Sequence, residues 1–94
     1  MSDVAAAIAN LRLRFLARSL DDLATLRRWS DAGARPDDDH RRILHRLAGA
    51  AGTFGFHELS ERAKRAEDAL HAGRPPAAEQ LRALLAELAK VTGG

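Results

Sequence analysis

The chain has 94 residues, a length that fits one domain with a small core, and it holds no cysteine, which excludes disulfides, thiolate nucleophiles and cysteine-based zinc sites. Its 15 Lys and Arg against 13 Asp and Glu give a formal net charge of +2, and the two signs alternate, which argues against the one-sided basic patch of a nucleic-acid binder. Leu and Ala dominate the apolar residues and aromatics make up 4%, so we expect a helical domain over residues 1–94.

The N-terminus carries no basic leader before a long apolar segment, and no stretch approaches about 18 apolar residues. We therefore expect a cytoplasmic protein that has no membrane partner. The short chain that starts at Met1 favours a free-standing protein over a domain taken from a larger one.

The first predicted helix runs from about Val4 to Asp31 and stops at residues 32–36, which include a glycine and a proline. Its apolar residues recur at spacings of three and four, the pattern of an amphipathic helix; they are Ile8, Leu11, Phe15, Leu16, Leu20, Leu23, Leu26 and Trp29. This stripe is wide, because Leu11 and Leu13 lie well around the helix from each other, so part of it is expected to face something other than the core. A break near Asn10 is an alternative.

Three shorter helices follow. The second opens at Asp37, an N-cap residue, and runs to about Thr53; the third spans roughly His57 to His71; the fourth begins after Pro76 and carries an apolar stripe. Glycine and proline residues mark the breaks between them, and no alternating strand pattern occurs. Short connections favour antiparallel neighbours, so the predicted fold is all-α, an antiparallel up-and-down four-helix bundle whose first helix is continuous or broken.

The second helix has a functional face. Its apolar residues fall in one sector at about 100° per residue; they are Leu44, Leu47, Ala51 and Phe54, with Ile43 and Ala50 at the edge. His45 lies nearly opposite and is predicted to face solvent, with Ala48, Gly49 and Gly52 beside it along the helix. Each interior glycine costs about 1 kcal/mol relative to alanine. We interpret the small residues as room for another protein to approach the imidazole.

Two arginines precede this histidine by one helical turn, Arg41 and Arg42. Guanidinium groups suit an imidazole that will carry an anion, and phosphate is the anion they bind best. The alternative, slightly favoured, is that both arginines pair with the acids of residues 37–39 across a helical turn.

The stretch at residues 44–56 reads LHRLAGAAGTFGF and resembles the signature of histidine-containing phosphotransfer (HPt) domains, His-x-Leu-Lys-Gly with a glycine six residues later. It is especially similar to the phosphotransfer domain at the start of chemotaxis histidine kinases, which shares the Ala-Gly-Thr-Phe-Gly-Phe run. Residues 59–67 resemble the pattern Leu-x-x-x-Ala-x-x-Leu-Glu of the following helix, with Ala66 in place of the second leucine.

The resemblance implies that His45 is the phosphoryl acceptor and that Gly49 and Gly55 open the site and end the helix. It implies that Glu67 orients the histidine through its other ring nitrogen, although a solvated helix acid is an equal alternative. The usual family lysine, three residues after the histidine, is Ala48 here.

That lysine neutralises phosphoryl oxygens in the family, so Arg41, Arg42 or Lys64 is expected to replace it. The partner-docking surface is predicted from two groups of residues: Ala48 and Gly52 beside the histidine, and Leu11, Leu13 and Phe15 on the first helix.

The resemblance implies in-line phosphoryl transfer in which a receiver domain supplies the aspartate and the magnesium ion, while this chain holds no cofactor of its own. No Gly-rich phosphate loop marks an ATP site, so we expect a phosphocarrier and not an enzyme. The expected partners are response-regulator receiver domains and a hybrid histidine kinase, with no nucleic acid, and the expected state is a monomer.

Three other functions stay open: an unphosphorylated HPt-like adaptor that regulates a receiver or kinase, a substrate domain of one particular histidine kinase, and a helical nucleic-acid binder. A metal site is not expected, because no two of the four histidines are four residues apart. The aromatic residues are interpreted as core or packing residues.

Overall fold

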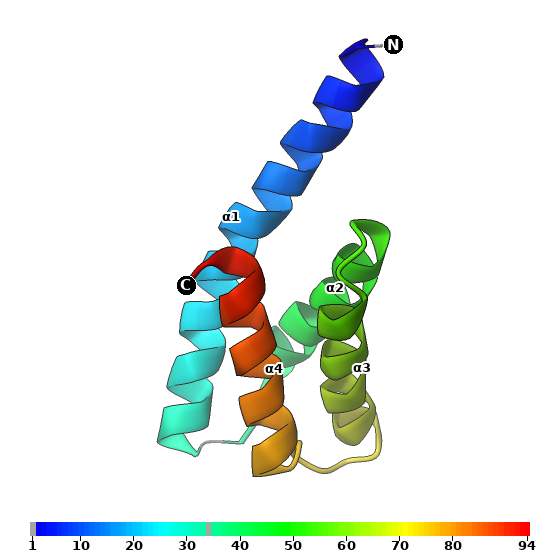
Figure 1. Cartoon of the computed structure of the whole chain (residues 1–94). Coiled ribbons are helices and arrows are strands. Elements are labelled where there is room, and N and C mark those ends of the chain that lie inside the picture. Colours follow the sequence, from blue (N-terminus) through cyan, green and yellow to red (C-terminus); the bar gives the residue numbers. More distant parts are fainter. Residues whose placement is uncertain (1, 34) are drawn as a thin grey trace.

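The computed structural model describes residues 2–33 and 35–94, and these form four helices: α1 (Ser2–Ala32), α2 (Asp38–Thr53), α3 (His57–His71) and α4 (Ala78–Thr92). Successive helices run in opposite directions (Figure 1). No strand occurs in the described part, so the predicted antiparallel up-and-down bundle is confirmed. None of the four helices is both long and apolar enough to cross a membrane.

The first helix is continuous through Asn10, so the alternative of a broken helix is wrong. It ends at Gly33, whose N–H donates to the Trp29 carbonyl oxygen at 3.2 Å and whose left-handed backbone (φ 59°) turns the chain out of the helix. Within the predicted stop, Ala34 lies outside the described residues, as does Met1.

The start of α2 is fixed by a reciprocal cap. The backbone N–H of His40 donates to Oδ1 of Asp37 at 3.1 Å, and the backbone N–H of Asp37 donates to Nδ1 of His40 at 3.0 Å. These contacts satisfy two N–H groups that the helix itself leaves unpaired. The predicted N-cap is therefore confirmed, and the hydrogen bond from His40 lowers the pKa of the Asp37 carboxyl below its ordinary value of 3.8.

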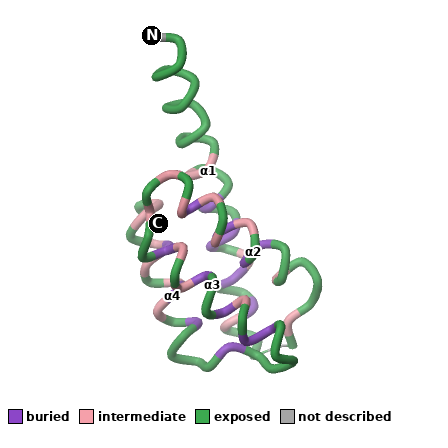
Figure 2. The backbone as a smooth tube through the Cα atoms, turned by 90° about the vertical axis from the view of Figure 1, so that its right-hand side faces the viewer, coloured by how far each residue is buried: buried purple, intermediate pink, exposed green. Residues whose placement is uncertain are grey.

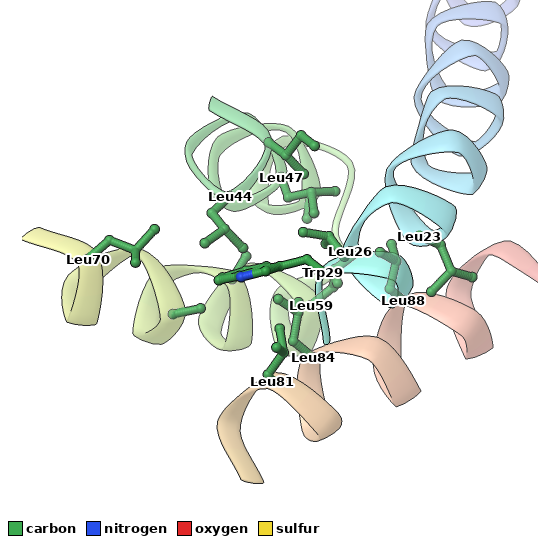
Figure 3. Close-up of a cluster of buried hydrophobic side chains, with 14 residues drawn as sticks. Leu23, Leu26, Trp29, Leu44, Leu47, Leu59, Leu70, Leu81, Leu84 and Leu88 are labelled. Atoms are coloured by element: carbon green, nitrogen blue, oxygen red, sulfur yellow. The ribbon is translucent and has the colours of Figure 1, made fainter. Parts of the chain in front are cut away.

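The core lies where all four helices meet (Figure 3), and Trp29 of α1 lies at its centre. Around it pack leucines from every helix; those exposed by 1% or less are Leu23, Leu26, Leu44, Leu47, Leu59, Leu84 and Leu88. Buried alanines of α2 and α3 complete the core: Ala51, Ala63 and Ala66. The residues that the sequence placed on the core sector of α2 are buried or half-buried.

The length of α1 sets it apart, because it has 31 residues while the other helices have 15 or 16. Its C-terminal half packs on α4, and its N-terminal half projects beyond the bundle (Figure 1). Residues 3–14 are all exposed (Figure 2). The apolar stripe is therefore core only from about Phe15 onward, since Ile8 and Leu11 remain 55% and 52% exposed.

We expect the Asp37 cap to make stability depend on pH. A carboxylate whose pKa is lowered by folding stabilises the folded state fully above its unfolded pKa of 3.8, and this stabilisation is lost as the pH falls through the folded pKa. Chemical denaturation of wild type and Asp37→Ala should give a difference in unfolding free energy that is largest above about pH 4 and shrinks below it. Asp37→Asn keeps a neutral acceptor, so its advantage over Asp37→Ala should not vary with pH; a pH-independent wild-type difference would contradict the role of the carboxylate.

Candidate functional site

His45 lies on the outer face of α2, and its side chain is 82% exposed. Leu44, the residue before it in the chain, is fully buried. The amphipathic pattern of α2 thus turns one side chain into the core and the next into solvent, and the predicted exposure of His45 is confirmed.

A side chain of α3 contacts the imidazole of His45 and orients it. Its Nδ1 lies 2.6 Å from Oε2 of Glu67, whose side chain is only 15% exposed. An ionised carboxylate can only accept hydrogen bonds, so with Glu67 ionised Nδ1 carries the proton. The lone pair then belongs to Nε2, the nitrogen on the far side of the ring from Glu67.

Small residues allow α3 to come close enough for this contact. Ala63 and Ala66 on the inner face of α3 are fully buried. At the same interface, the Ser60 hydroxyl donates to the Ala48 carbonyl oxygen at 2.6 Å. A Cβ added to Gly52 would lie 3.3 Å from Oγ of Ser60. Gly52 therefore faces α3 and not open solvent, which differs from its predicted place on an open docking face.

The remaining small residues lie nearer the histidine. A Cβ added to Gly49 would meet no atom within 4 Å, so the surface one turn after His45 is open. Ala48 is half-buried and packs against the core. The position where the resemblance implies a lysine thus presents only a half-buried methyl group.

A shallow hollow surrounds His45 between α2 and α3, and it is lined by Arg41, Arg42, His45, Glu67, Leu70 and His71. The arginines differ in their contacts: Arg42 pairs with Asp39 at 3.2 Å, as the alternative interpretation predicted, whereas Arg41 makes no ion pair within residues 2–33 and 35–94. Lys64 is exposed one turn before Glu67 and does not line the hollow. Of the three cations expected to replace the family lysine, Arg41 is the one that combines proximity with an unengaged guanidinium.

His71 is a site residue that was not predicted from the sequence. Its Nε2 lies 3.7 Å from the same Oε2 of Glu67 that contacts His45. The two imidazoles therefore approach one carboxylate from α2 and α3. The spacing of four residues between Glu67 and His71 would have indicated this contact, since such residues are neighbours on a helix.

The residue after the histidine, Arg46, ties α2 to α1. Its guanidinium lies 2.6 Å from Oδ1 of Asp22, a carboxylate that is only 8% exposed. A buried carboxylate of this kind is tolerated because a charged partner satisfies it. The sequence signal for the contact is an acid on the core-facing stripe of α1, between the residues that pack inward.

The predicted docking residues of α1 do not form one surface. Phe15 is half-buried and packs on Phe54 and Phe56, with ring centroids 5.4 and 5.7 Å away. Leu11 and Leu13 are exposed by 52% and 63%, but two residues subtend about 200° on a helix, so they lie on opposite sides of α1. A single partner surface reaches one of these leucines and not both.

No cluster of three metal-ligating side chains occurs within the described ranges 2–33 and 35–94. His40, one of the histidines considered for such a site, stacks on Trp29 with ring centroids 4.4 Å apart and closes the cap of α2. Its geometry therefore has a structural explanation.

The family model described as "Hpt domain" matches residues 10–91. No curated protein and no solved structure gives a significant match.

We expect Glu67→Gln to remove the preference for one tautomer of His45. A glutamine side chain presents both an acceptor and a donor to the ring, so neither ring nitrogen is forced to carry the proton. Long-range ¹H–¹⁵N NMR of the imidazole should show Nδ1 protonated in the wild type and a mixture in the variant. Glu58→Gln is the matched control, because Glu58 lies on the same helix and pairs with Arg62 at 2.7 Å; a tautomer unchanged in Glu67→Gln would show that the carboxylate does not set it.

Proposed function

Because the chain belongs to the Hpt domain family, we propose that it is a phosphorelay intermediate that accepts a phosphoryl group on His45 and passes it to a receiver domain. Domains of this family serve histidine phosphotransfer in two-component systems as phosphocarriers without an ATP site of their own. The observation that carries the assignment to His45 is its exposed imidazole, anchored through Nδ1 on Glu67 at 2.6 Å.

The anchoring determines which atom reacts. Nε2 of His45 attacks the phosphorus of an aspartyl phosphate in line with the leaving carboxylate, so the N–P bond forms as the P–O bond to the aspartate breaks. The carboxylate leaves as an anion, and the proton on Nδ1 stays between the ring and Glu67. Positive charge that develops on the imidazole faces the Glu67 carboxylate, which stabilises it. The reverse step, to a second receiver aspartate, uses the same contacts.

Two positively charged groups neutralise the negative charge of the transferred phosphoryl group. We propose that Arg41, one helical turn before His45, contacts the phosphoryl oxygens in place of the lysine replaced by Ala48. The magnesium ion held by the receiver supplies the other positive charge. The loose transition state spreads negative charge over three oxygens, so a guanidinium at the rim of the hollow contributes mainly by electrostatic stabilisation.

The docking partner is proposed to be a receiver domain that covers the outer face of α2. Gly49 leaves open space beside the histidine, and so permits the close approach that in-line attack on a partner-bound phosphoryl group requires. A hybrid histidine kinase is a candidate source of that receiver domain.

A second candidate function is an adaptor that binds a receiver without being phosphorylated. It is favoured by one observation, the alanine at position 48 where related domains carry a cation. Its distinguishing feature is binding without transfer, so one assay separates it from the phosphorelay.

We expect acid-labile label on the wild type, and none on His45→Gln, when a panel of phosphorylated receiver domains is mixed with the protein. His57→Gln is the control, since His57 is an exposed histidine at the start of α3 outside the hollow. Label retained by His45→Gln would contradict the assignment of the acceptor. A receiver that binds the wild type while no receiver transfers to it would support the adaptor.

We expect Arg41→Ala to slow phosphoryl transfer by about tenfold or more, because a charge-assisted hydrogen bond is worth about 1.5–3 kcal/mol. Arg42→Ala should have a smaller effect, since Arg42 is engaged with Asp39. Arg28→Ala on α1, whose guanidinium contacts Thr25, should leave the rate unchanged. Rapid-quench transfer rates at saturating receiver concentration measure the three effects; equal rates for Arg41→Ala and Arg28→Ala would exclude Arg41 from the transition state.

A further inference from the structure

The projecting half of α1 carries an apolar stripe that the rest of the described chain leaves largely uncovered, since only its last member, Phe15, is half-buried. Its members, which we call the N-terminal stripe, are Val4, Ile8, Leu11 and Phe15. The first three are exposed by 65%, 55% and 52%. The spacings of four, three and four residues place all of them on one face of the helix.

This face is the outward continuation of the core. Ile8 and Leu26 are eighteen residues apart, which is five turns at about 3.6 residues per turn, so both side chains leave α1 in the same direction. Leu26 is fully buried in the bundle, whereas Ile8 is 55% exposed and belongs to the half of α1 that projects beyond the bundle (Figure 1). A core-facing stripe that continues without a helix to cover it indicates an interaction surface.

We propose that a second copy of this chain covers the N-terminal stripe, with the two α1 helices antiparallel. The stripe is self-complementary in that direction, because its spacing of four, three and four residues reads the same from both ends. Ile8 of one copy then lies opposite Leu11 of the other, and Val4 lies opposite the part of Phe15 that its packing on Phe54 and Phe56 leaves exposed. The contact is isologous, so it closes as a dimer and does not extend into a filament.

Charge favours the antiparallel direction. Residues 4–9 of α1 contain no charged side chain, whereas Arg12, Arg14 and Arg18 follow within three turns. A parallel pair would place the three arginines of one helix beside the three of the other, and like charges at such short distances destabilise an interface. The antiparallel pair places these arginines beside the uncharged segment and brings Arg14 and Arg18 toward Asp3 of the other copy, while Arg12 lies over the Phe56 ring of its own chain at 4.7 Å.

The bundles leave room for this arrangement. In an antiparallel pair the two bundles lie at opposite ends of the helix pair, whereas a parallel pair would place both at the same end. A groove between α1 and α2 continues the N-terminal stripe toward the bundle, and its apolar lining includes Leu11, Phe15, Leu47, Ala50 and Phe54. The first turns of α1 from the second copy can seat in this groove. The hollow at His45 is separate, because it lies between α2 and α3. The dimer therefore does not rest on the proposed function, and it departs from the monomer that the family resemblance implies.

The first test is the mass of the full chain as a function of concentration. Light scattering coupled to size exclusion, together with sedimentation equilibrium, should show the mass rising from 10.2 kDa toward twice that value between micromolar and millimolar concentration. Ile8→Glu and Leu11→Glu should raise the concentration of half-dimerisation by about tenfold or more, since each buries a charge in the contact. Leu13→Glu is the matched control, because Leu13 is exposed by 63% on the opposite side of the same helix.

Circular dichroism of each variant checks that the bundle is folded, and the substituted side chains are exposed in the single chain. A mass of 10.2 kDa up to millimolar concentration overturns the proposal, even if a receiver domain is found to bind the stripe. Equal weakening by Leu13→Glu and Leu11→Glu overturns it as well.

The second test determines which residues of the two α1 helices lie opposite each other. The chain has no cysteine, so single cysteines report only the contact into which they are placed. An equimolar mixture of Ile8→Cys and Leu11→Cys should form the mixed disulfide faster than either variant forms its own under mild oxidation. Preferential homodisulfides in both variants would show a parallel pair and overturn the antiparallel proposal.

Discussion

The close packing of α2 on α3 is the constraint on which the site depends. His45 and Glu67 belong to different helices, so their contact of 2.6 Å exists only if the two backbones approach closely along their length. Buried alanines and the contact of Gly52 with Ser60 provide that closeness, and the Ser60 hydroxyl fixes the register of the two helices through the Ala48 carbonyl. A larger residue at this interface would separate the acceptor from the carboxylate that orients it, without touching either one.

The sequence predicted the helices well because their ends are determined locally. Glycine, proline and an aspartate cap act within one turn of each break, and these are the positions where the helices end or begin. The extent of the core on α1 could not be predicted in the same way. Whether Ile8 and Leu11 are covered depends on the lengths of three other helices, a property that the periodicity of α1 does not contain.

The site was predictable in part for a similar reason. Exposure of His45 follows from the amphipathic pattern of α2, but which α3 carboxylate reaches it was supplied by resemblance to a family and not by spacing along the chain. The contacts between Asp22 and Arg46, and between Glu67 and His71, were missed. The first depends on how α1 crosses α2, which no local pattern specifies; the second involves a four-residue spacing that many surface pairs share without consequence.

The exposure of His45 has a consequence for signalling through such a protein. Under the proposed function, one phosphoryl group is held per chain, on a side chain that is 82% open to water and with no means of making more. Such a carrier passes on what it receives and has no gain. The phosphoryl group is then exposed to hydrolysis for as long as the chain is unbound, so the time between the encounters with the donor and the acceptor domain limits how much of the signal is delivered.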